Sequence, residues 1–498
     1  MPGTGSRILI RYSGDLTTKA RATRQRFTTR LTHNLKDALG EARGSSTVQR
    51  TRDRIVIETS EAIDPMPLAR VQGVQSISLA ERWEWSSLQD LVAAGCELFR
   101  EAVRDRRFAV RVHRVGDRTH IPIAGQELER ALGAELAPLA ARVDLTNPEV
   151  TVHIEVLAGE AFLFSERLAG PGGLPLGVEG HALALASGGF DSVVAAWLML
   201  KRGVDVDYLL CNLGGRAHQL EAVRVLKVLA RDWSYGSRPH LHAVDFDAVT
   251  RDLQANVSQR YWQVVLKRLM LRAAEQVARE RDAAAIITGD AVGQVSSQTL
   301  RNIATISEAT RLPILRPLVG FNKNEILEIA RKIGTYDLSK QVGEYCAMVP
   351  SKPATAARLA SIQSEETRLD AGLLERAVAE RSVLDLRALD LDALDVPNLE
   401  AHEIPGDATV LDLRSKAAYQ AWHYPDALFL DFATALRAYP SMAKDARYVI
   451  YCEFGLKSAH LAELMQRDGF EAHHFKQGLG DLLAYAREQG AATPDAND

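Results

Sequence analysis

A chain of 498 residues is too long for one hydrophobic core, and at about 150 residues per domain it predicts three or four domains. Its hydrophobic content of 46% and charged content of 25% are ordinary for a globular protein, and no apolar run approaches the roughly 20 residues needed to cross a bilayer. The N-terminal residues also lack the apolar segment of a secretory signal, so we expect a cytoplasmic protein with no membrane partner.

The net charge of −4 conceals an asymmetry between the two ends of the chain. Residues 1–60 carry 12 Lys and Arg against 5 Asp and Glu, whereas residues 361–498 carry 13 against 24. The N-terminal end therefore suits a polyanion and the C-terminal end does not. The chain has four cysteines, Cys96, Cys211, Cys346 and Cys452. They are too few for a disulfide framework and form no CxxC pair, so no zinc or iron–sulfur site is expected.

The first 64 residues predict a small α/β domain with a basic helix. Strands at 8–12 and 54–58 flank a helix at 19–40, which gives a βαβ pattern. The charge of this helix fits two interpretations, a solvated face or a set of contacts to RNA phosphates. The basic residues in question are Lys19, Arg21, Arg24, Arg26 and Arg30.

The next hundred residues shift this balance toward RNA. Alternating strands at 108–112 and 150–156 enclose a helix at 126–136. Phe108-Ala-Val-Arg-Val-His-Arg, the Gln126-Glu-Leu-Glu-Arg helix and Asp144-Leu-Thr-Asn-Pro-Glu-Val together resemble the THUMP domain, an α/β module of tRNA-modifying enzymes. The resemblance covers residues 65–168. It implies that residues 1–168 hold tRNA by phosphate contacts and shape, with Arg111 among the contacting residues.

A glycine-rich turn follows an apolar strand at 182–186. The turn carries Gly188 and Gly189, and a helix is expected to begin near Asp191. Glycines permit close approach of a ligand, and a helix N-terminus offers free N–H groups to an anion. A plain tight turn is the alternative, but the order of strand, turn and helix with Asp191 and Ser192 favours a phosphate cradle. It is not a GxxxxGK[ST] loop, because no lysine follows. SGGFDS resembles the PP-loop of ATP pyrophosphatases, which leave an adenylated substrate.

Residues 175–390 predict a doubly wound α/β domain. Strand-like and helical runs alternate, which indicates a parallel, Rossmann-like sheet with ligands at the carboxyl ends of its strands. Three polar segments follow predicted strands: the 187–192 loop, Asn212–Gly215 and Thr288–Asp290. The expected strands are 182–186, 207–211, 241–245, 284–288 and 312–316, and the clearest helices are 216–231 and 258–281.

The last hundred residues predict a second α/β domain with a reactive cysteine. A strand at 448–452 ends in Cys452, and the chain then turns into a helix. This setting favours a nucleophilic thiolate, although a lone strand-end cysteine can equally be a small buried hydrophobe. Residues 400–495 resemble a rhodanese domain, which makes Cys452 the persulfide carrier. Ser458 stands where related phosphatases need Arg, and Lys457 replaces an Arg of many rhodaneses, which leaves activity toward free thiosulfate open.

The motifs together resemble tRNA uridine 4-sulfurtransferase, the ThiI family. SGGFDS, NLGG, TGDAVGQVSSQTL and the EYC of 344–346 follow the THUMP-like region. The resemblance implies an N-terminal ferredoxin-like domain at 1–64, THUMP at 65–168, a PP-loop domain at 175–390 and rhodanese at 400–495. It also implies ATP and Mg²⁺ as cofactors. The residues expected at the nucleotide are Leu185, Ala186, Ser187, Gly188, Gly189, Asp191, Ser192, Lys267, Gly289, Gln298 and Lys323.

The resemblance further implies a reaction, 4-thiouridine formation at tRNA position eight. ATP adenylates the uridine O4, and sulfur from a Cys452 persulfide displaces AMP. A cysteine desulfurase would load Cys452. Cys346 would resolve the persulfide through a transient Cys346–Cys452 disulfide that a cellular disulfide reductant resets. Asp191 would organise Mg²⁺ or manage a proton, a choice the sequence leaves open.

Other partners and functions stay open at this point. The family resemblance also implies sulfur transfer to a thiamine-pathway sulfur carrier protein, and it leaves a homodimer open. One alternative is a tRNA-binding or docking protein with a degenerate ATP site. Another is a PP-loop thiolase acting on a different tRNA base, although such relatives often use CxxC metal sites that this chain lacks.

Overall fold

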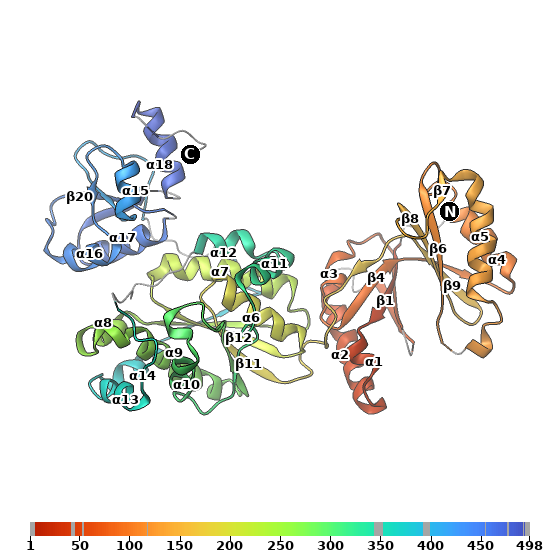
Figure 1. Ribbon diagram of the computed structural model, residues 1–498, viewed down its shortest axis with the longest axis horizontal. Coiled ribbons are helices and arrows are strands. Elements are labelled where there is room, and N and C mark those ends of the chain that lie inside the picture. Colours follow the sequence, from red (N-terminus) through yellow and green to blue (C-terminus); the bar gives the residue numbers. More distant parts are fainter. Residues whose placement is uncertain are drawn as a thin grey trace. The chain divides into compact units, whose positions relative to one another are not determined.

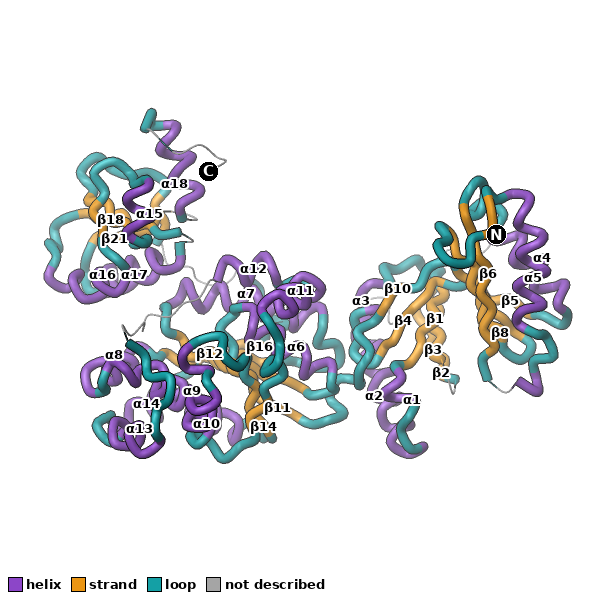
Figure 2. The backbone as a smooth tube through the Cα atoms, viewed as in Figure 1, coloured by secondary structure: helices purple, strands orange, loops and turns teal. Residues whose placement is uncertain are grey.

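The chain folds into two compact units in the computed structural model, which describes residues 5–40, 45–51, 54–116, 118–342, 352–391, 399–453, 455–475, 478–491 and 493. The first unit comprises Met1–Glu179 with two short returns, Leu200–Val204 and Asp232–Ser237, and the second comprises the remaining residues. Figures 1 and 2 show that each unit contains sheets flanked by helices.

The first sheet of the N-terminal unit is antiparallel, in the order β10-β4-β1-β3-β2. Ile8 and Ile10 on its central strand pack with Phe27, Leu31 and Leu35 of helix α2, which forms the core of this half. The elements are β1 (Arg7–Tyr12), α1 (Gly14–Thr17), α2 (Arg21–Ala38), β2 (Ser46–Arg50), β3 (Arg54–Thr59), α3 (Met66–Ala69), β4 (Val74–Leu79) and β10 (Leu168–Ala169).

The predicted strand at 54–58 is present as β3, but the expected βαβ pattern omits a strand before it. β3 pairs antiparallel with β1, because the unpredicted strand β2 comes first and forms a hairpin with β3. β2 is an edge strand with a mostly exposed, polar sequence, so it carries no hydrophobic alternation from which to predict it. The Gly/Pro segment at 169–180 is tied to this sheet, since the N–H groups of Gly170 and Gly172 donate to the carbonyls of Gln75 and Val74.

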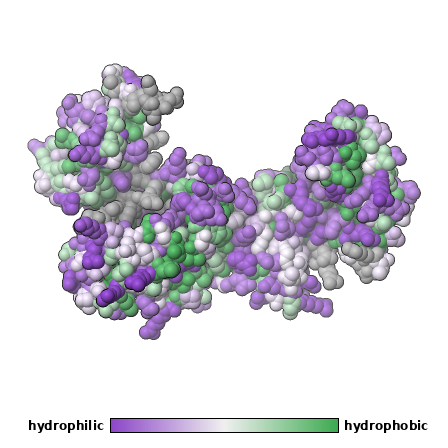
Figure 3. Space-filling view, in the orientation of Figure 1, coloured by the Kyte–Doolittle hydropathy of each residue, from purple (hydrophilic) through white to green (hydrophobic). Residues whose placement is uncertain are grey.

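The second sheet of this unit has the order β5-β9-β8-β6-β7, and helices α4 and α5 cover it. β6 and β8 contain the predicted strands at 108–112 and 150–156, and they run parallel with Phe108 opposite Val150. Hydrophilic residues cover most of the unit's surface in the view of Figure 3. The elements are β5 (Glu81–Glu84), α4 (Leu88–Phe99), β6 (Arg107–Arg114), α5 (Gly125–Leu136), β7 (Arg142–Val143), β8 (Val150–Val156) and β9 (Glu160–Phe164).

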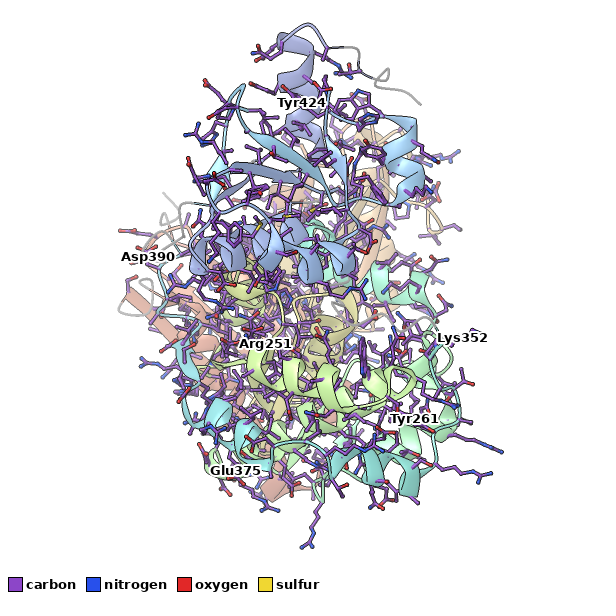
Figure 4. The ribbon with its side chains drawn as sticks, turned by 90° about the vertical axis from the view of Figure 1, so that its left-hand side faces the viewer. Arg251, Tyr261, Lys352, Glu375, Asp390 and Tyr424 are labelled. Atoms are coloured by element: carbon purple, nitrogen blue, oxygen red, sulfur yellow. The ribbon has the colours of Figure 1, made fainter. Side chains whose placement is uncertain are left out.

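The main sheet of the second unit confirms the Rossmann-like prediction. Its order is β15-β14-β11-β12-β13-β16, and all pairs are parallel except that of the added edge strand β16. Leu183 and Leu209 of the sheet share one core with helices α8, α9, α10, α13 and α14, and Figure 1 shows α6 and α7 toward the other face. In Figure 4, Arg251 marks α8 and Glu375 marks α14.

The strands of this sheet are β11 (His181–Leu185), β12 (Asp205–Asn212), β13 (His240–Asp245), β14 (Ala285–Ile287), β15 (Ile314–Leu315) and β16 (Ser382–Asp385). Its helices are α6 (Phe190–Lys201), α7 (Gly215–Asp232), α8 (Asp247–Asn256), α9 (Trp262–Glu280), α10 (Leu300–Ser307), α11 (Lys323–Ile333), α12 (Tyr336–Val342), α13 (Leu359–Glu366) and α14 (Ala371–Ala379).

The C-terminal sheet is fully parallel, in the order β17-β21-β20-β18-β19, with hydrophobic clusters on both faces. None of the helices in the described part of the chain is both long and apolar enough to span a bilayer. The elements are β17 (Glu400–Ala401), β18 (Thr409–Asp412), α15 (Lys416–Ala421), β19 (Leu428–Phe429), α16 (Phe432–Ala438), β20 (Arg447–Tyr451), α17 (Leu456–Arg467), β21 (Glu471–Phe475) and α18 (Leu479–Glu488).

Candidate functional site

The glycine-rich turn joins β11 to α6 as a closed loop of backbone and hydroxyl contacts. Ser192 Oγ donates to the Gly189 carbonyl at 3.1 Å and accepts from the Ser187 N–H at 3.3 Å. Gly188 has φ +79°, and a Cβ atom there would lie 2.8 Å from Ala222 Cα, so both conformation and space require glycine. The loop therefore presents backbone groups at the N-terminus of α6, because its two glycines have no side chains that would cover them.

Gly289 brings the end of β14 against this helix N-terminus. A Cβ atom at Gly289 would lie 2.7 Å from both the Asp191 carbonyl carbon and the Ser192 nitrogen. The absence of a side chain thus lets two strand-end loops meet, backbone to backbone. Leu185, at the end of β11, packs against the core, and Ala186 fixes the strand end by an N–H bond of 2.9 Å to the Leu209 carbonyl.

Asp191 lies at the first turn of α6 and has two partners from later in the chain. It accepts a hydrogen bond of 2.9 Å from Lys323 Nζ and one of 2.8 Å from Gln294 Nε2. Lys323 is the first residue of α11, whose start is fixed by a capping box between Asn322 and Glu325. Asp191 and Lys323, both predicted site residues, are therefore direct neighbours.

Asp290, in the loop that follows β14, is the second carboxylate. It accepts a bond of 2.9 Å from Lys267 Nζ and 2.8 Å from the Thr288 hydroxyl, and Arg316 Nε lies 3.3 Å away. Burial raises the pKa of Asp290, but the charge and hydrogen bond of Lys267, the Thr288 hydrogen bond and the charge of Arg316 together outweigh burial and lower the pKa to about 2. Asp290 is therefore ionised at neutral pH and holds two cations.

The site fits a nucleoside triphosphate. Three cations, Lys267, Arg316 and Lys323, face two carboxylates, so the side chains leave a positive surplus for phosphates. Gln298 donates weakly to Asp290 at 3.4 Å, while its buried Oε1 has no hydrogen-bond partner among the described residues. A buried acceptor of this kind calls for a donor from a bound molecule.

Cys452 follows β20 directly, and 4% of its surface is exposed. Its Sγ lies 3.4 Å from the hydroxyl of Ser458, which donates to the Gly455 carbonyl at 2.8 Å. Gly455, with φ +83°, allows the chain to turn into α17. A short loop thus wraps the thiol, and the position that would carry the arginine of a phosphatase holds a buried serine.

The floor of this loop is fixed by a buried ion pair. Arg414 Nη2 donates to Asp412 at 2.7 Å, and the Tyr451 hydroxyl donates to the same carboxylate at 2.6 Å. Asp412 is fully buried. The two strand ends β18 and β20 are therefore locked beside Cys452.

The remaining cysteines differ from Cys452 in setting. Burial raises the pKa of the Cys211 thiol, which lies in the core of the sheet, and burial also raises the pKa of Cys96. Such thiols are poor nucleophiles. Cys346, and with it the predicted disulfide to Cys452, lies outside the described residues.

The predicted RNA-contacting residues divide into two groups. Arg21 and Arg26 are exposed on α2, and Lys19 and Arg24 are partly exposed. Arg30, by contrast, donates at 2.8 Å to the carbonyls of both Leu176 and Gly236, which ties α2 to two distant loops of its own unit. Arg111 donates to the Leu145 carbonyl at 2.6 Å.

A basic cavity of about 460 Å³ lies beside Arg111 in this unit. Glu155 lies in it, 2% exposed, and accepts from Arg11 Nε at 2.6 Å and Arg54 Nε at 2.8 Å. Burial and the surrounding arginines lower the pKa of His153 to about 4. The cavity is therefore positively charged through arginines at neutral pH.

Sequence reasoning missed Arg316 and gave Asp290 and Gln294 no individual role. Asp290 lies in the Thr288–Asp290 segment after β14, and Arg316 directly follows β15, so the rule that ligands lie at the carboxyl ends of parallel strands could have found both. The strand predicted at 312–316 included Arg316, so Arg316 was not recognised as a residue at a strand end; the observed strand ends at Leu315.

Four family models match the chain in succession. The "ThiI ferredoxin-like domain" model matches residues 7–78, and the THUMP domain model matches 86–166. The model described as "Thiamine biosynthesis protein (ThiI)" matches 177–371, and the rhodanese-like domain model matches 398–483.

Curated relatives match at nearly full length, and a solved structure matches about three quarters of the chain. A tRNA sulfurtransferase of Pyrobaculum aerophilum is 35% identical, covering 94% of this chain and 96% of its own. One of Desulfurococcus amylolyticus is 37% identical, covering 96% and 98%. The crystal structure of a 4-thiouridine synthetase–RNA complex with bound ATP matches with a TM-score of 0.67 and 29% identity, covering 76% of this chain and 99% of that chain.

Proposed function

The chain belongs to the ThiI family of tRNA sulfurtransferases, and we propose that it makes 4-thiouridine at position eight of tRNA by adenylating the uridine O4. The observation that carries the proposal is the pair of linked strand ends at Gly188 and Gly289, where a backbone phosphate cradle meets Lys267 and Lys323. The 4-thiouridine synthetase of similar fold, solved with ATP and RNA, supports the same ligands here.

Adenylation explains why the cradle needs cations but no GK[ST] lysine. The O4 of uridine is a poor leaving group until its bond to phosphorus makes AMP the group that leaves. Lys267 and Lys323 would stabilise the negative charge that develops as pyrophosphate departs, an effect worth a few kcal/mol per donor. Asp191 would orient Lys323 and could share Mg²⁺ with the triphosphate, which supplies further charge neutralisation when bound.

Sulfur transfer completes the reaction. A cysteine desulfurase would load Cys452 as Cys452–S–SH. The Cys346 thiolate would attack Cys452 Sγ, so the S–S bond breaks and the outer sulfur bonds to C4 while AMP leaves with the former O4. The two electrons for this step come from the two cysteines, which end as a disulfide. A cellular disulfide reductant would then restore both thiols.

The basic N-terminal unit would hold the tRNA. Arg21 and Arg26 are exposed on α2 and available to phosphates, and the cavity beside Arg111 adds a second positive surface. The Cys452 segment could also pass sulfur to a thiamine-pathway sulfur carrier protein, since loading of Cys452 needs no tRNA.

One reconstitution tests the proposal. The protein is incubated with a cysteine desulfurase, cysteine, ATP, Mg²⁺ and unmodified tRNA, and the digested nucleosides are separated by mass. We expect 4-thiouridine, mapped to position eight, with one AMP and one pyrophosphate per thiouridine. A thiolated base other than 4-thiouridine would favour the different-base alternative, and tRNA binding without pyrophosphate would favour a docking protein.

A further inference from the structure

The nucleotide site, formed by the glycine-rich turn and the residues around Asp191 and Asp290, contains these two carboxylates, which differ in exposure and in their partners. Asp191 is 23% exposed and holds one cation, Lys323, which is itself 42% exposed. Asp290 is 14% exposed, and both of its oxygens are engaged: Oδ1 by Lys267, and Oδ2 by Thr288 and Arg316. Asp290 is thus closed to further ligands, while Asp191 is open toward solvent.

Arg316 is held from two sides. Its Nε lies 3.3 Å from Asp290, and its Nη2 donates to the Ser307 hydroxyl at 2.8 Å. Ser307 ends α10 and donates in turn to the Ile303 carbonyl at 2.6 Å. With 15% of its side chain exposed, Arg316 is fixed in place at the end of β15.

The geometry points to Asp290 and Arg316 as positioning residues for Lys267, an inference that rests on the proposed adenylation. Asp290 fixes the aim of the Lys267 ammonium, which otherwise sits on a flexible stem. Arg316 is the second cation on the same carboxylate. Because one negative charge is shared by two positive ones, Lys267 keeps a net attraction for a phosphate rather than being neutralised.

A role for Asp290 as a magnesium ligand explains the contacts less well. A metal ligand needs a free oxygen lone pair directed at the ion, and two cations beside Asp290 would repel Mg²⁺. Mg²⁺ is therefore assigned to the triphosphate and not to Asp290.

The positioning role and the magnesium-ligand role of Asp290 predict different results for Asp290→Asn. The positioning role also predicts a change in MgATP affinity for Arg316→Ala. Asp290→Asn removes a negative charge from a phosphate site, so affinity for MgATP stays equal or rises. Turnover falls about 100-fold because the ammonium of Lys267 is no longer aimed. Arg316→Ala leaves Lys267 fully paired with Asp290, so MgATP affinity falls about tenfold. Arg316→Lys restores most of the affinity.

The experiment measures MgATP affinity by equilibrium dialysis without tRNA, and kcat and KM for ATP in the thiolation assay. Arg311→Ala is the matched control, since Arg311 is exposed before β15 and contacts neither carboxylate with its side chain among the interactions described. Thermal unfolding verifies that each variant is folded. Should Asp290→Asn fail to fold, the Arg316→Ala and Arg316→Lys pair decides.

Two results overturn the inference. One is unchanged MgATP affinity in Arg316→Ala. The other is an Asp290→Asn variant whose lost turnover returns when Mg²⁺ is raised, which would make Asp290 a metal ligand. The proposed function fails separately, if the wild-type protein binds MgATP but makes no thiouridine, and the affinities still decide on Arg316. A wild-type protein that does not bind MgATP overturns both.

Discussion

The nucleotide site and the Cys452 site are built on different principles. Residues of the nucleotide site come from segments as far apart as Ser187 and Lys323, and ion pairs between those segments hold it together. The polar contacts described around the Cys452 thiol come from the turn at Gly455, the first turns of α17 and the strand ends beneath it. The first site therefore depends on the whole fold for its chemistry, whereas the second depends on a single turn.

Cys452→Ser gives the largest expected effect and separates the two sites. Thiouridine formation falls to background because no persulfide can form, while affinity for MgATP and tRNA is unchanged. Nucleoside analysis and equilibrium dialysis measure the two halves. Cys96→Ser is the control, and a Cys452→Ser protein that still thiolates tRNA would remove Cys452 from the reaction.

Cys346→Ser tests whether the sulfur site extends beyond its own loop. We expect Cys452 to be loaded with sulfane sulfur as in the wild type and thiouridine formation to be nearly abolished. Persulfide labelling of the intact protein measures the first, and nucleoside analysis over many turnovers measures the second. Full activity over many turnovers would show that no Cys346–Cys452 disulfide is formed.

Asp191→Asn acts on the nucleotide site alone. Lys323 loses its charged partner, and we expect pyrophosphate release with tRNA to fall about 100-fold, as for loss of one oriented electrostatic group. Loading of Cys452 by a desulfurase stays at the wild-type rate. If loading falls in parallel, the two sites are coupled and the comparison breaks down.

Gly188→Ala strains the cradle without changing any charge. Alanine at φ +79° costs about 1–3 kcal/mol, and its Cβ would meet Ala222. We expect lower stability to denaturant and weaker MgATP binding, with persulfide loading intact. Gly293→Ala is a fair control for conformational strain, since it also has positive φ but open space around it. Equal loss of MgATP affinity in both variants would mean that contact with Ala222 is irrelevant.

Asp207→Asn has the smallest expected effect on adenylation and on persulfide loading. Asp207 lies near the N-terminal end of β12, whereas the nucleotide site lies at the carboxyl ends of the strands. Its hydrogen bond raises the pKa of His181, outweighing burial. The stabilisation from protonated His181 is fully present below its unfolded pKa of about 6.5 and is lost as pH rises through the higher folded value.

The variant should therefore lose about 1–3 kcal/mol of stability at about pH 5.5 and less at about pH 8.5. Unfolding by denaturant at both pH values measures this difference, and pyrophosphate release should be unchanged. A loss that is equal at both pH values would exclude His181 as the titrating group.

The fold was largely predictable where strands are buried and regular. The strands ending at Leu185, Asn212 and Asp245 contain short, mostly buried apolar runs, and the carboxyl-end rule placed the 187–192 loop and Thr288–Asp290 at one edge. The exposed edge strand β2 and the two-residue strand β10 have no such pattern, so their pairing could not be seen.

The partners within the sites were less predictable than the residues. Lys267 and Lys323 were identified by resemblance, yet their pairing with Asp290 and Asp191 spans 23 and 132 positions. Arg30 shows the same limit, since its carbonyl partners at Leu176 and Gly236 lie 146 and 206 residues away. In sequence, Arg30 cannot be distinguished from the exposed arginines Arg21 and Arg26 beside it.

The cover over Cys452 has a consequence for the lifetime of any sulfur stored there. Sulfane sulfur is lost to each thiol that reaches it, because exchange requires a thiolate to approach the S–S bond. A cysteine with 4% of its surface exposed gives small cellular thiols little access. Burial of Cys452 would thus slow the loss of stored sulfur to such thiols.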